Sequence, residues 1–407
     1  MVLVPLFDEN MTVKAYSVFS QKNNLLLNPI LLGTGSLDGS GRISGLEVVE
    51  NVGIETLPDD TELFVPVTNI SVFTDIENQC DAPHERIVLL IDNTIPPIDM
   101  YINRLKELKE MGYKLAIRKL AVVEFENYRE VLKLMDYVLL NNKKIAIDKA
   151  KIYFGKLFPN IKLCAGNVET MEIFDGLKAS GGYELYEGNF YRVAITQGQN
   201  EVAPLKINYI KLLNVVNNDN FELSEAADII GHDTALTISL IQMVNRMTLN
   251  SGITSIRHAA AMLGQRELKK WINTAVVGEL YADKPNEITR LSLLRAKFAE
   301  NLASYFDLAM KKEELFLMGL FSVLDVILER TMEDALEMVK VSKDIKEALV
   351  KGKGPLAKVL DFIIPYEAAN WSEVSRQMIV NDIEEETVSK AYMDSLAWYR
   401  DLMAAEK

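Results

Sequence analysis

Apolar and polar positions follow one periodicity before about residue 200 and a different one after it. In the first half, short apolar runs of roughly four to eight residues predict buried strands. These runs lie at 2–8, 63–68, 86–92, 113–120, 136–141 and 161–166. Between two of them, Ile98, Ile102, Leu105 and Leu108 recur at helical spacing, and Gly112 predicts the end of that helix. Strands that alternate with helices predict a parallel sheet, either a barrel or a doubly wound fold.

Beyond about Pro204 almost every segment has a 3.6-residue period, and the strand-like runs disappear. One predicted helix, SIRHAAAML, ends at Gly264, and EELFLMGLFSVLDVILER predicts a buried helix further along. The polar stretch TQGQNEVAP separates the two halves. We therefore expect an α/β domain over residues 1–197 and an all-helical domain over residues 198–407.

Composition limits the class of partner. Of the 407 residues, 49% are hydrophobic and 25% are charged, as in a soluble globular protein. The net charge of −14 repels phosphate backbones and anionic headgroups, which argues against nucleic acid and membrane surfaces as general partners. No signal-peptide or membrane-spanning pattern is visible, and Cys80 and Cys164 form no CxxC motif. These features predict a cytoplasmic protein without a thiolate metal site.

The first half contains, in this order, the phrases LKEMGYKLAIRKL, MDYVLLN, NVETMEIF and GGYELYEGNFY. Together they resemble the EAL domain, a bacterial barrel that hydrolyses cyclic di-GMP. The resemblance covers roughly residues 1–195 and implies a barrel with its chemistry at the carboxyl ends of the strands. In that family, carboxylates and an Asn at these ends hold divalent cations that activate water.

The resemblance places the family's functional positions on residues that mostly lack a carboxylate. These positions are Ser17, Gln21, Pro66, Leu90, Arg118, Lys119, Leu139, Asn141, Gly166, Glu169 and Glu187. Ser17 takes the place of the name-giving Glu, and Arg118 and Lys119 take the places of paired aspartates. Cations there repel a divalent ion and remove its ligands. We therefore expect no metal and no catalysis in the barrel.

Three interpretations of Arg118 and Lys119 remain open. The first is a salt-bridged strand end with an acid such as Glu169 or Glu187 as partner. The second is a residual anion site that takes a phosphate. The third is a surface that contacts another protein.

The second half resembles the HDOD domain, a helical relative of the HD phosphohydrolases. The phrases are ALTISLIQMVNRMTLNSGITSIRHAAAMLGQRELKKW and EELFLMGLFSVLDVIL. The resemblance places the family's His-Asp dyad on Ser322 and Val323, and an upstream His on Arg295, so no metal dyad is expected there.

Only His84, His232 and His258 are histidines, and His232 directly precedes Asp233. We expect Asp233 to cap the helix that follows rather than to bind a metal. His258 is expected to be a packed or surface residue, and His84 lies in a polar loop without an evident partner.

Together, an EAL-type barrel followed by an HDOD bundle predicts a non-enzymatic signalling regulator that acts by protein contacts and carries no cofactor. The alternative is a receptor that binds cyclic di-GMP, or another anionic nucleotide, without hydrolysis; an active phosphodiesterase is a third hypothesis. A homo-oligomer is compatible with the sequence. One candidate contact surface is the final helical stretch, where Trp398 and Tyr399 are expected to be exposed.

Overall fold

The computed structural model describes residues 1–19, 60–192, 204–218, 220–247, 255–280 and 286–406, together with residues 43, 46, 49 and 57. The chain forms two compact units. One unit holds residues 1–193 and 364–397, and the other holds residues 194–363 and 398–407. The predicted domain boundary after residue 197 lies outside the described residues.

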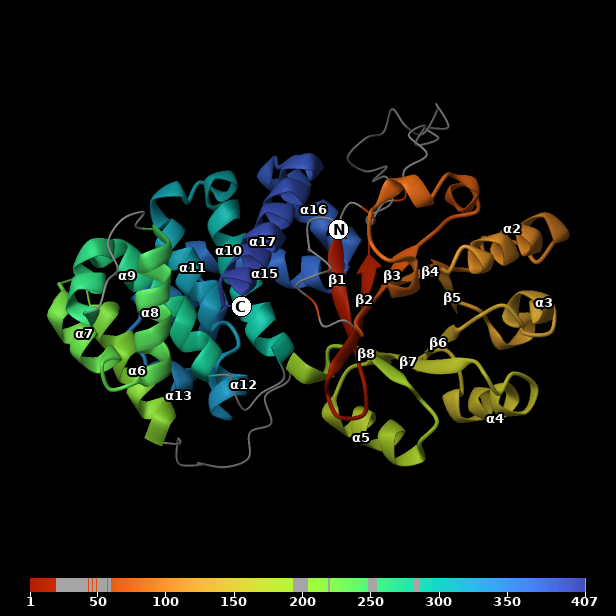
Figure 1. The fold of residues 1–407 in the computed structure, drawn as a ribbon, viewed down its shortest axis with the longest axis horizontal. Coiled ribbons are helices and arrows are strands. Elements are labelled where there is room, and N and C mark those ends of the chain that lie inside the picture. The colour runs from red at the N-terminus through yellow and green to blue at the C-terminus, as the bar shows by residue number, and fades with distance from the viewer. Residues whose placement is uncertain are drawn as a thin grey trace. The chain divides into compact units, whose positions relative to one another are not determined.

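The first unit contains a closed barrel of eight described strands, paired in sequence order (Figure 1). The strands are β1 (Val2–Phe7), β2 (Val13–Phe19), β3 (Glu62–Pro66), β4 (Ile87–Ile91), β5 (Lys114–Arg118), β6 (Tyr137–Asn141), β7 (Lys162–Val168) and β8 (Leu185–Gly188). Every neighbouring pair from β2 to β8 is parallel, whereas β1 is antiparallel to both β2 and β8. The barrel and its mainly parallel sheet are therefore confirmed, and β1 is antiparallel, an orientation that the apolar pattern did not indicate. The apolar pattern by itself also missed β2 and β8.

Alternate residues of each strand fill the interior of the barrel, because successive side chains of a strand point to opposite faces. This core consists of Leu6, Ala15, Phe64, Val88, Leu90, Ala116, Tyr137, Leu139, Cys164 and Leu185. Burial raises the pKa of the Cys164 thiol well above its ordinary value. Cys164 is therefore a packed thiol rather than a reactive one.

Among the described residues, α-helices follow four of the strands. They are α2 (Asp99–Glu110), α3 (Arg129–Leu132), α4 (Ile147–Leu157) and α5 (Met171–Ser180). The predicted helix near residues 98–112 is confirmed as α2, with Leu105 and Leu108 buried. Gly112 has φ = +99°, a conformation open to glycine, and the chain turns there into β5.

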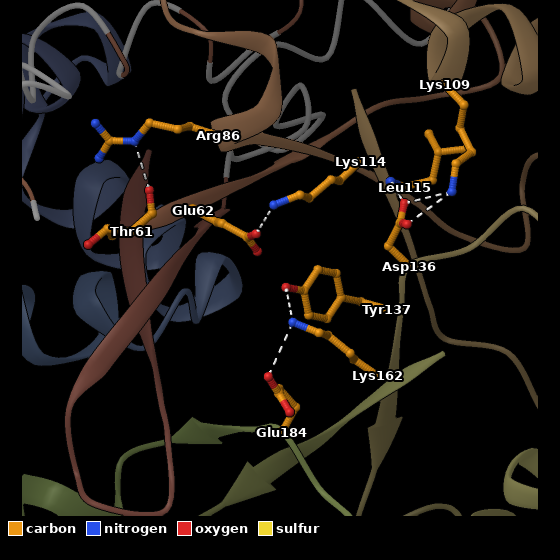
Figure 2. A network of polar contacts seen from close by, with 10 residues as sticks. All are labelled: Thr61, Glu62, Arg86, Lys109, Lys114, Leu115, Asp136, Tyr137, Lys162 and Glu184. Carbon is orange, nitrogen blue, oxygen red and sulfur yellow. Dashed lines mark hydrogen bonds and ion pairs between the residues drawn. The ribbon is translucent and has the colours of Figure 1, made fainter. Parts of the chain in front are cut away.

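Charged side chains close the amino end of the barrel (Figure 2). Glu62 of β3 pairs with Lys114 of β5. Lys162 of β7 pairs with Glu184 at 3.2 Å, and its Nζ lies 3.5 Å from the Tyr137 hydroxyl oxygen. Burial, together with the neighbouring Glu62, raises the pKa of Tyr137, so the phenol stays protonated. Both of these lysines meet a carboxylate, at the end of the barrel that usually serves stability.

A second tie at this end joins α2 to the sheet. Lys109 on α2 donates to Asp136 Oδ1 at 2.9 Å, and the other carboxylate oxygen accepts from the backbone N–H of Leu115 at 2.8 Å (Figure 2). One carboxylate thus fixes the helix and two neighbouring strands at a single point.

The second unit is all-helical over its described residues. Its helices are α6 (Pro204–Val216), α7 (Leu223–Ile230), α8 (Thr234–Met247), α9 (Ile256–Leu280), α10 (Asn286–Leu302), α11 (Lys312–Phe321), α12 (Leu324–Leu328), α13 (Met332–Glu337) and α14 (Lys343–Lys351), and the chain continues through α15 (Pro355–Glu367), α16 (Trp371–Asn381) and α17 (Glu385–Glu406). Gly264 interrupts α9 with φ = +73°, which confirms the helix end predicted there. The helix predicted over residues 313–330 is instead two helices separated at Ser322–Val323. No helix in the described ranges is both long enough and apolar enough to span a membrane.

Residues 364–397 pack with the barrel rather than with the helical unit. Arg192 forms a buried ion pair with Glu367 at 3.0 Å. Tyr366 donates its hydroxyl to the carbonyl of Met1 at 2.8 Å, and the N–H of Leu3 donates to the hydroxyl of Tyr392 at 3.4 Å. The amino end of β1 is thereby held by side chains from the far end of the chain.

Trp398 and Tyr399 are half-buried, so the expectation that they are exposed is wrong. Trp398 packs edge-on against Phe316, with Lys297 over its ring at 5.9 Å. Arg290 lies 5.9 Å from the ring centre of Tyr399. These rings contribute to packing within the helical unit.

Gly188 at the end of β8 cannot accept a side chain, which gives a first prediction. A Cβ at Gly188 would lie 1.8 Å from the carbonyl oxygen of Val168, and this backbone atom cannot move aside alone. We expect Gly188→Ala to destabilise the barrel by about 3 kcal/mol or more, measured by urea unfolding. Gly155→Ala in α4 is the control: a Cβ there meets nothing within 4 Å, so this helical change should be neutral or stabilise by about 0.5–1 kcal/mol. Equal unfolding midpoints for the two variants would contradict the close backbone approach.

Candidate functional site

The carboxyl ends of β2–β8 form one mouth of the barrel, the end at which barrels of this class place their chemistry. Polar side chains replace the apolar core there. Ser17 on β2 lies one alternation beyond core residue Ala15, Arg118 lies one beyond Ala116, and Glu187 lies one beyond Leu185. The interior face of the sheet thus changes from apolar to charged within two residues.

Arg118 reaches across this mouth. Its Nη2 donates to Ser17 Oγ at 3.0 Å and to Glu187 Oε1 at 3.2 Å. Its guanidinium carbon lies 4.6 Å from the centre of the Phe19 ring, within the range of a cation–π contact. Because β5 is three strands from both β2 and β8, this single side chain connects strands on opposite sides of the barrel.

Lys119 lies beside Arg118 in a strained backbone conformation. Its φ of +62° falls in the left-handed region, which non-glycine residues seldom adopt. Its Nζ lies 3.1 Å from Asp92 Oδ2, and its side chain is 62% exposed. Strained residues of this kind cluster at functional sites, so the conformation supports a role for the mouth.

Asp92 follows β4 and is held by hydrogen bonds. Thr94 donates to Asp92 Oδ1 from its backbone N–H at 3.0 Å and from its hydroxyl at 2.6 Å. Burial acts to raise the pKa of Asp92, but the hydrogen bonds from Thr94 and Lys119 outweigh it, so the net shift is downward. The carboxylate is therefore ionised at neutral pH and fixes Lys119.

A third ion pair lies after β6 and β7. Lys143 contacts Glu169 at 2.6 Å, with both side chains more than half exposed. Asn141 at the end of β6 accepts from the N–H of Lys143 at 3.0 Å through its side chain. Just before Glu169, Asn167 has φ = +61° at a shift of register between β7 and β8. The left-handed residues Lys119 and Asn167 thus both lie at this mouth.

Most residues expected at the pocket do lie around this mouth. Lateral pairs in the sheet join Pro66 to Leu90, Arg118 to Leu139, Asn141 to Gly166, and Gly166 to Glu187. Leu90 and Leu139 belong to the apolar core and are unsuited to hold a polar ligand. Gln21 lies outside the described residues.

Of the three interpretations of Arg118 and Lys119, the salt-bridged strand end matches the contacts. Glu187 is the partner of Arg118, whereas Glu169 pairs with Lys143 instead. The sequence reasoning missed Asp92 and Phe19. Asp92 directly follows a buried apolar strand, and Phe19 lies two residues beyond Ser17 on the same face, so strand alternation could have found both.

The side chains present do not fit the divalent-metal site that the resemblance implies. Asp92, Glu169 and Glu187 each meet their own lysine or arginine instead of converging. Across the described residues, no group of three His, Cys, Asp or Glu side chains could hold a metal ion.

The positions where the resemblance implied a His-Asp dyad hold side chains that are not typical metal ligands. Arg295 on α10 donates to Ser322 Oγ at 2.9 Å, and Ser322 donates to the carbonyl of Gly319 at 2.7 Å. Val323 is buried. Burial raises the pKa of Asp325, although nearby Arg295 acts in the opposite direction. A guanidinium and a hydroxyl thus take the place of metal ligands between α10 and α11.

The His232-Asp233 pair is a helix start. Asp233 Oδ1 accepts from the N–H of Leu236 at 2.9 Å, which confirms the predicted cap of α8, and Oδ2 accepts from the hydroxyl of Tyr209 at 2.8 Å. His84 stacks on Tyr113 with ring centres 4.3 Å apart, and its Nδ1 lies 2.9 Å from the carbonyl oxygen of Met111. His84 thus has partners that the sequence did not reveal.

Comparison with known proteins agrees with this architecture. Residues 203–351 match the HDOD domain family, so the closed eight-stranded barrel is followed by a helical region with an HDOD domain. The chain is 28% identical over 325 residues to "Cyclic di-GMP phosphodiesterase CdgJ" of Vibrio cholerae, covering 79% of this chain and 74% of CdgJ. It is 25% identical over 365 residues to "Uncharacterized protein YuxH" of Bacillus subtilis, covering 88% of each.

Among solved structures, the chain resembles a standalone EAL protein from Vibrio cholerae O395 in its c-di-GMP-bound form. The identity is 16%, the match covers 47% of this chain and 90% of that chain, and the TM-score is 0.37. At that score the likeness supports no argument about ligands.

The expectation that the chain is not an enzyme is contradicted by these comparisons. CdgJ, which matches most of this chain, is named a phosphodiesterase. That expectation came from the residues at the positions where the EAL resemblance implies metal ligands. Those residues do not by themselves exclude activity.

The contacts of Asp92 give a second prediction. The carboxyl carbon of Asp92, followed by NMR, should titrate below the ordinary pKa of 3.8. Because the folded pKa is lowered, the stability from this carboxylate is complete above the unfolded value and is lost as pH falls through the folded pKa. Lys119→Ala should raise the titration midpoint, whereas Lys143→Ala, the same loss of charge at the mouth, should leave it unchanged. A wild-type midpoint at or above 3.8 would show that Thr94 and Lys119 do not hold this group.

Proposed function

We propose that the protein acts in cyclic di-GMP signalling and that the mouth of its barrel binds the dinucleotide. The observation that carries the proposal is the guanidinium of Arg118, placed by three partners at the mouth, with the exposed ammonium of Lys119 beside it. The match to CdgJ, whose name includes cyclic di-GMP, supports this choice of ligand.

The chemistry of the ligand suits these groups. Cyclic di-GMP carries two phosphodiesters, each with one negative charge. A planar guanidinium binds phosphate oxygens through paired N–H donors, and a lysine adds a mobile point charge. The chain as a whole carries a charge of −14, which repels a dinucleotide from most of its surface. Binding is therefore expected only where cations are held locally, as at this mouth.

A direct binding measurement tests the proposal. Calorimetry with cyclic di-GMP should give micromolar affinity for the wild type, and Arg118→Ala combined with Lys119→Ala should weaken it by about tenfold to a hundredfold, because two phosphate contacts are lost. The control combines Lys133→Ala and Lys343→Ala, which removes the same charge from exposed lysines that are not part of the mouth and should change affinity less than threefold.

The same titration is run with magnesium and with a chelator, and the samples are then analysed for hydrolysis by chromatography. Binding with turnover and binding without it both agree with the proposal. The absence of binding at millimolar dinucleotide, or an equal loss in the control variant, would contradict it.

We also propose that the HDOD domain contacts another signalling protein. Residues 203–351 match the HDOD family, and the resemblance to that family implies a scaffold role. Exposed apolar side chains in the same range also support the proposal, among them Met262 at 53% and Met310 at 98% exposure. Cross-linking of the full chain in its native host, followed by mass spectrometry, should recover one protein linked mainly to residues 203–351. Cross-links confined to the barrel would contradict this assignment.

A further inference from the structure

The geometry points to Glu187 as an internal anion that occupies Arg118 and that a phosphate must displace, so that Glu187 sets the charge specificity of the mouth. The inference deepens the proposed function and rests on it for the identity of the ligand. Strongly charged anions would displace Glu187 from Arg118 more readily than weakly charged ones, so this carboxylate would select between them.

The first support is the burial of the pair. The side chains of Arg118 and Glu187 are only 14% and 13% exposed, in contrast to the other two ion pairs of the mouth. The Lys119–Asp92 pair is 62% and 15% exposed, and the Lys143–Glu169 pair is 57% and 51% exposed. Water screens an exposed pair, whereas a buried pair keeps most of its attraction. Glu187 is therefore the strongest local competitor for any anion that approaches Arg118.

The second support is the way the guanidinium is used. Its hydrogen bonds to Ser17 and to Glu187 both come from Nη2, and the Phe19 ring lies at 4.6 Å from its carbon. Paired binding of a phosphate requires two N–H donors that point the same way. The Glu187 carboxylate must therefore release Nη2 before a phosphate can bind this edge of the guanidinium.

The third support is the space around the carboxylate. Gly166 lies directly beside Glu187 in the sheet, and a Cβ at Gly166 would lie 3.6 Å from Glu187 Oε2. That distance is an ordinary van der Waals contact, so the neighbouring β7 residue does not crowd the carboxylate at the mouth. Ser17 remains a neutral acceptor for Arg118 after Glu187 yields, so the guanidinium stays in position while its charge becomes available.

Two isosteric variants test the inference. Glu187→Gln removes the charge of the internal anion, and Glu169→Gln removes the same charge from the exposed pair of the same mouth. Each variant is titrated with cyclic di-GMP, with inorganic pyrophosphate and with uncharged guanosine. Circular dichroism and the thermal midpoint establish that each variant is folded.

We expect Glu187→Gln to bind cyclic di-GMP and pyrophosphate about tenfold more tightly than the wild type, because the ligand no longer competes with a charged partner of Arg118. Glu169→Gln frees Lys143, a cation of the same mouth that water already screens, so it should tighten either affinity by a clearly smaller factor than Glu187→Gln does. Guanosine should not distinguish the variants. If pyrophosphate shows this pattern while cyclic di-GMP binds to none of the proteins, the inference stands and the proposed function fails.

Equal gains in the two variants would overturn the inference, because they would reflect general electrostatics of the mouth. A matching gain for guanosine would also overturn it, because a wider mouth rather than a freed charge would then explain the result. No gain in Glu187→Gln for either anion would do the same.

Discussion

The reach of Arg118 across the barrel is the interaction on which the mouth depends. A guanidinium that starts on β5 contacts β2 and β8, and the ring of Phe19 supports it. It lies at the top of an interior that is otherwise apolar. A charge in such a place is stable only with partners, and Glu187 and Ser17 provide them. The same contacts hold the cation at the end of the barrel where a ligand can meet it.

Charged side chains form ion pairs at both ends of the barrel, but their surroundings differ. At the amino end, Glu62, Lys114, Lys162 and Glu184 form pairs that close the barrel around a protonated Tyr137. At the carboxyl end the backbone is also strained, since Lys119 and other residues take left-handed conformations. Matched ion pairs thus occur at both ends, and the left-handed residues Lys119 and Asn167 lie next to the pairs of the carboxyl end, where barrels of this class place their chemistry.

The helical half shows how one fold accommodates different side chains at the same positions. Arg295 and Ser322 form a hydrogen bond where the resemblance to HD phosphohydrolases led us to look for a metal dyad, and Asp233 caps α8. The HDOD match over residues 203–351 agrees with the helical architecture of this half. Because CdgJ is named a phosphodiesterase, the side chains at the mouth of this barrel do not establish that the protein is inactive.

The sequence by itself determined the alternation of strands and helices in the first half, the helical second half, the stop at Gly112 and the cap at Asp233. These features depend on periodicity and on hydrogen bonds between near neighbours, which local sequence encodes. Only the tertiary structure decided that the sheet closes with an antiparallel β1, that Glu187 rather than Glu169 pairs with Arg118, and that residues 364–397 pack with the barrel. Each of these joins residues far apart in the chain, and such pairings follow from the closure and register of the sheet, which no local pattern specifies.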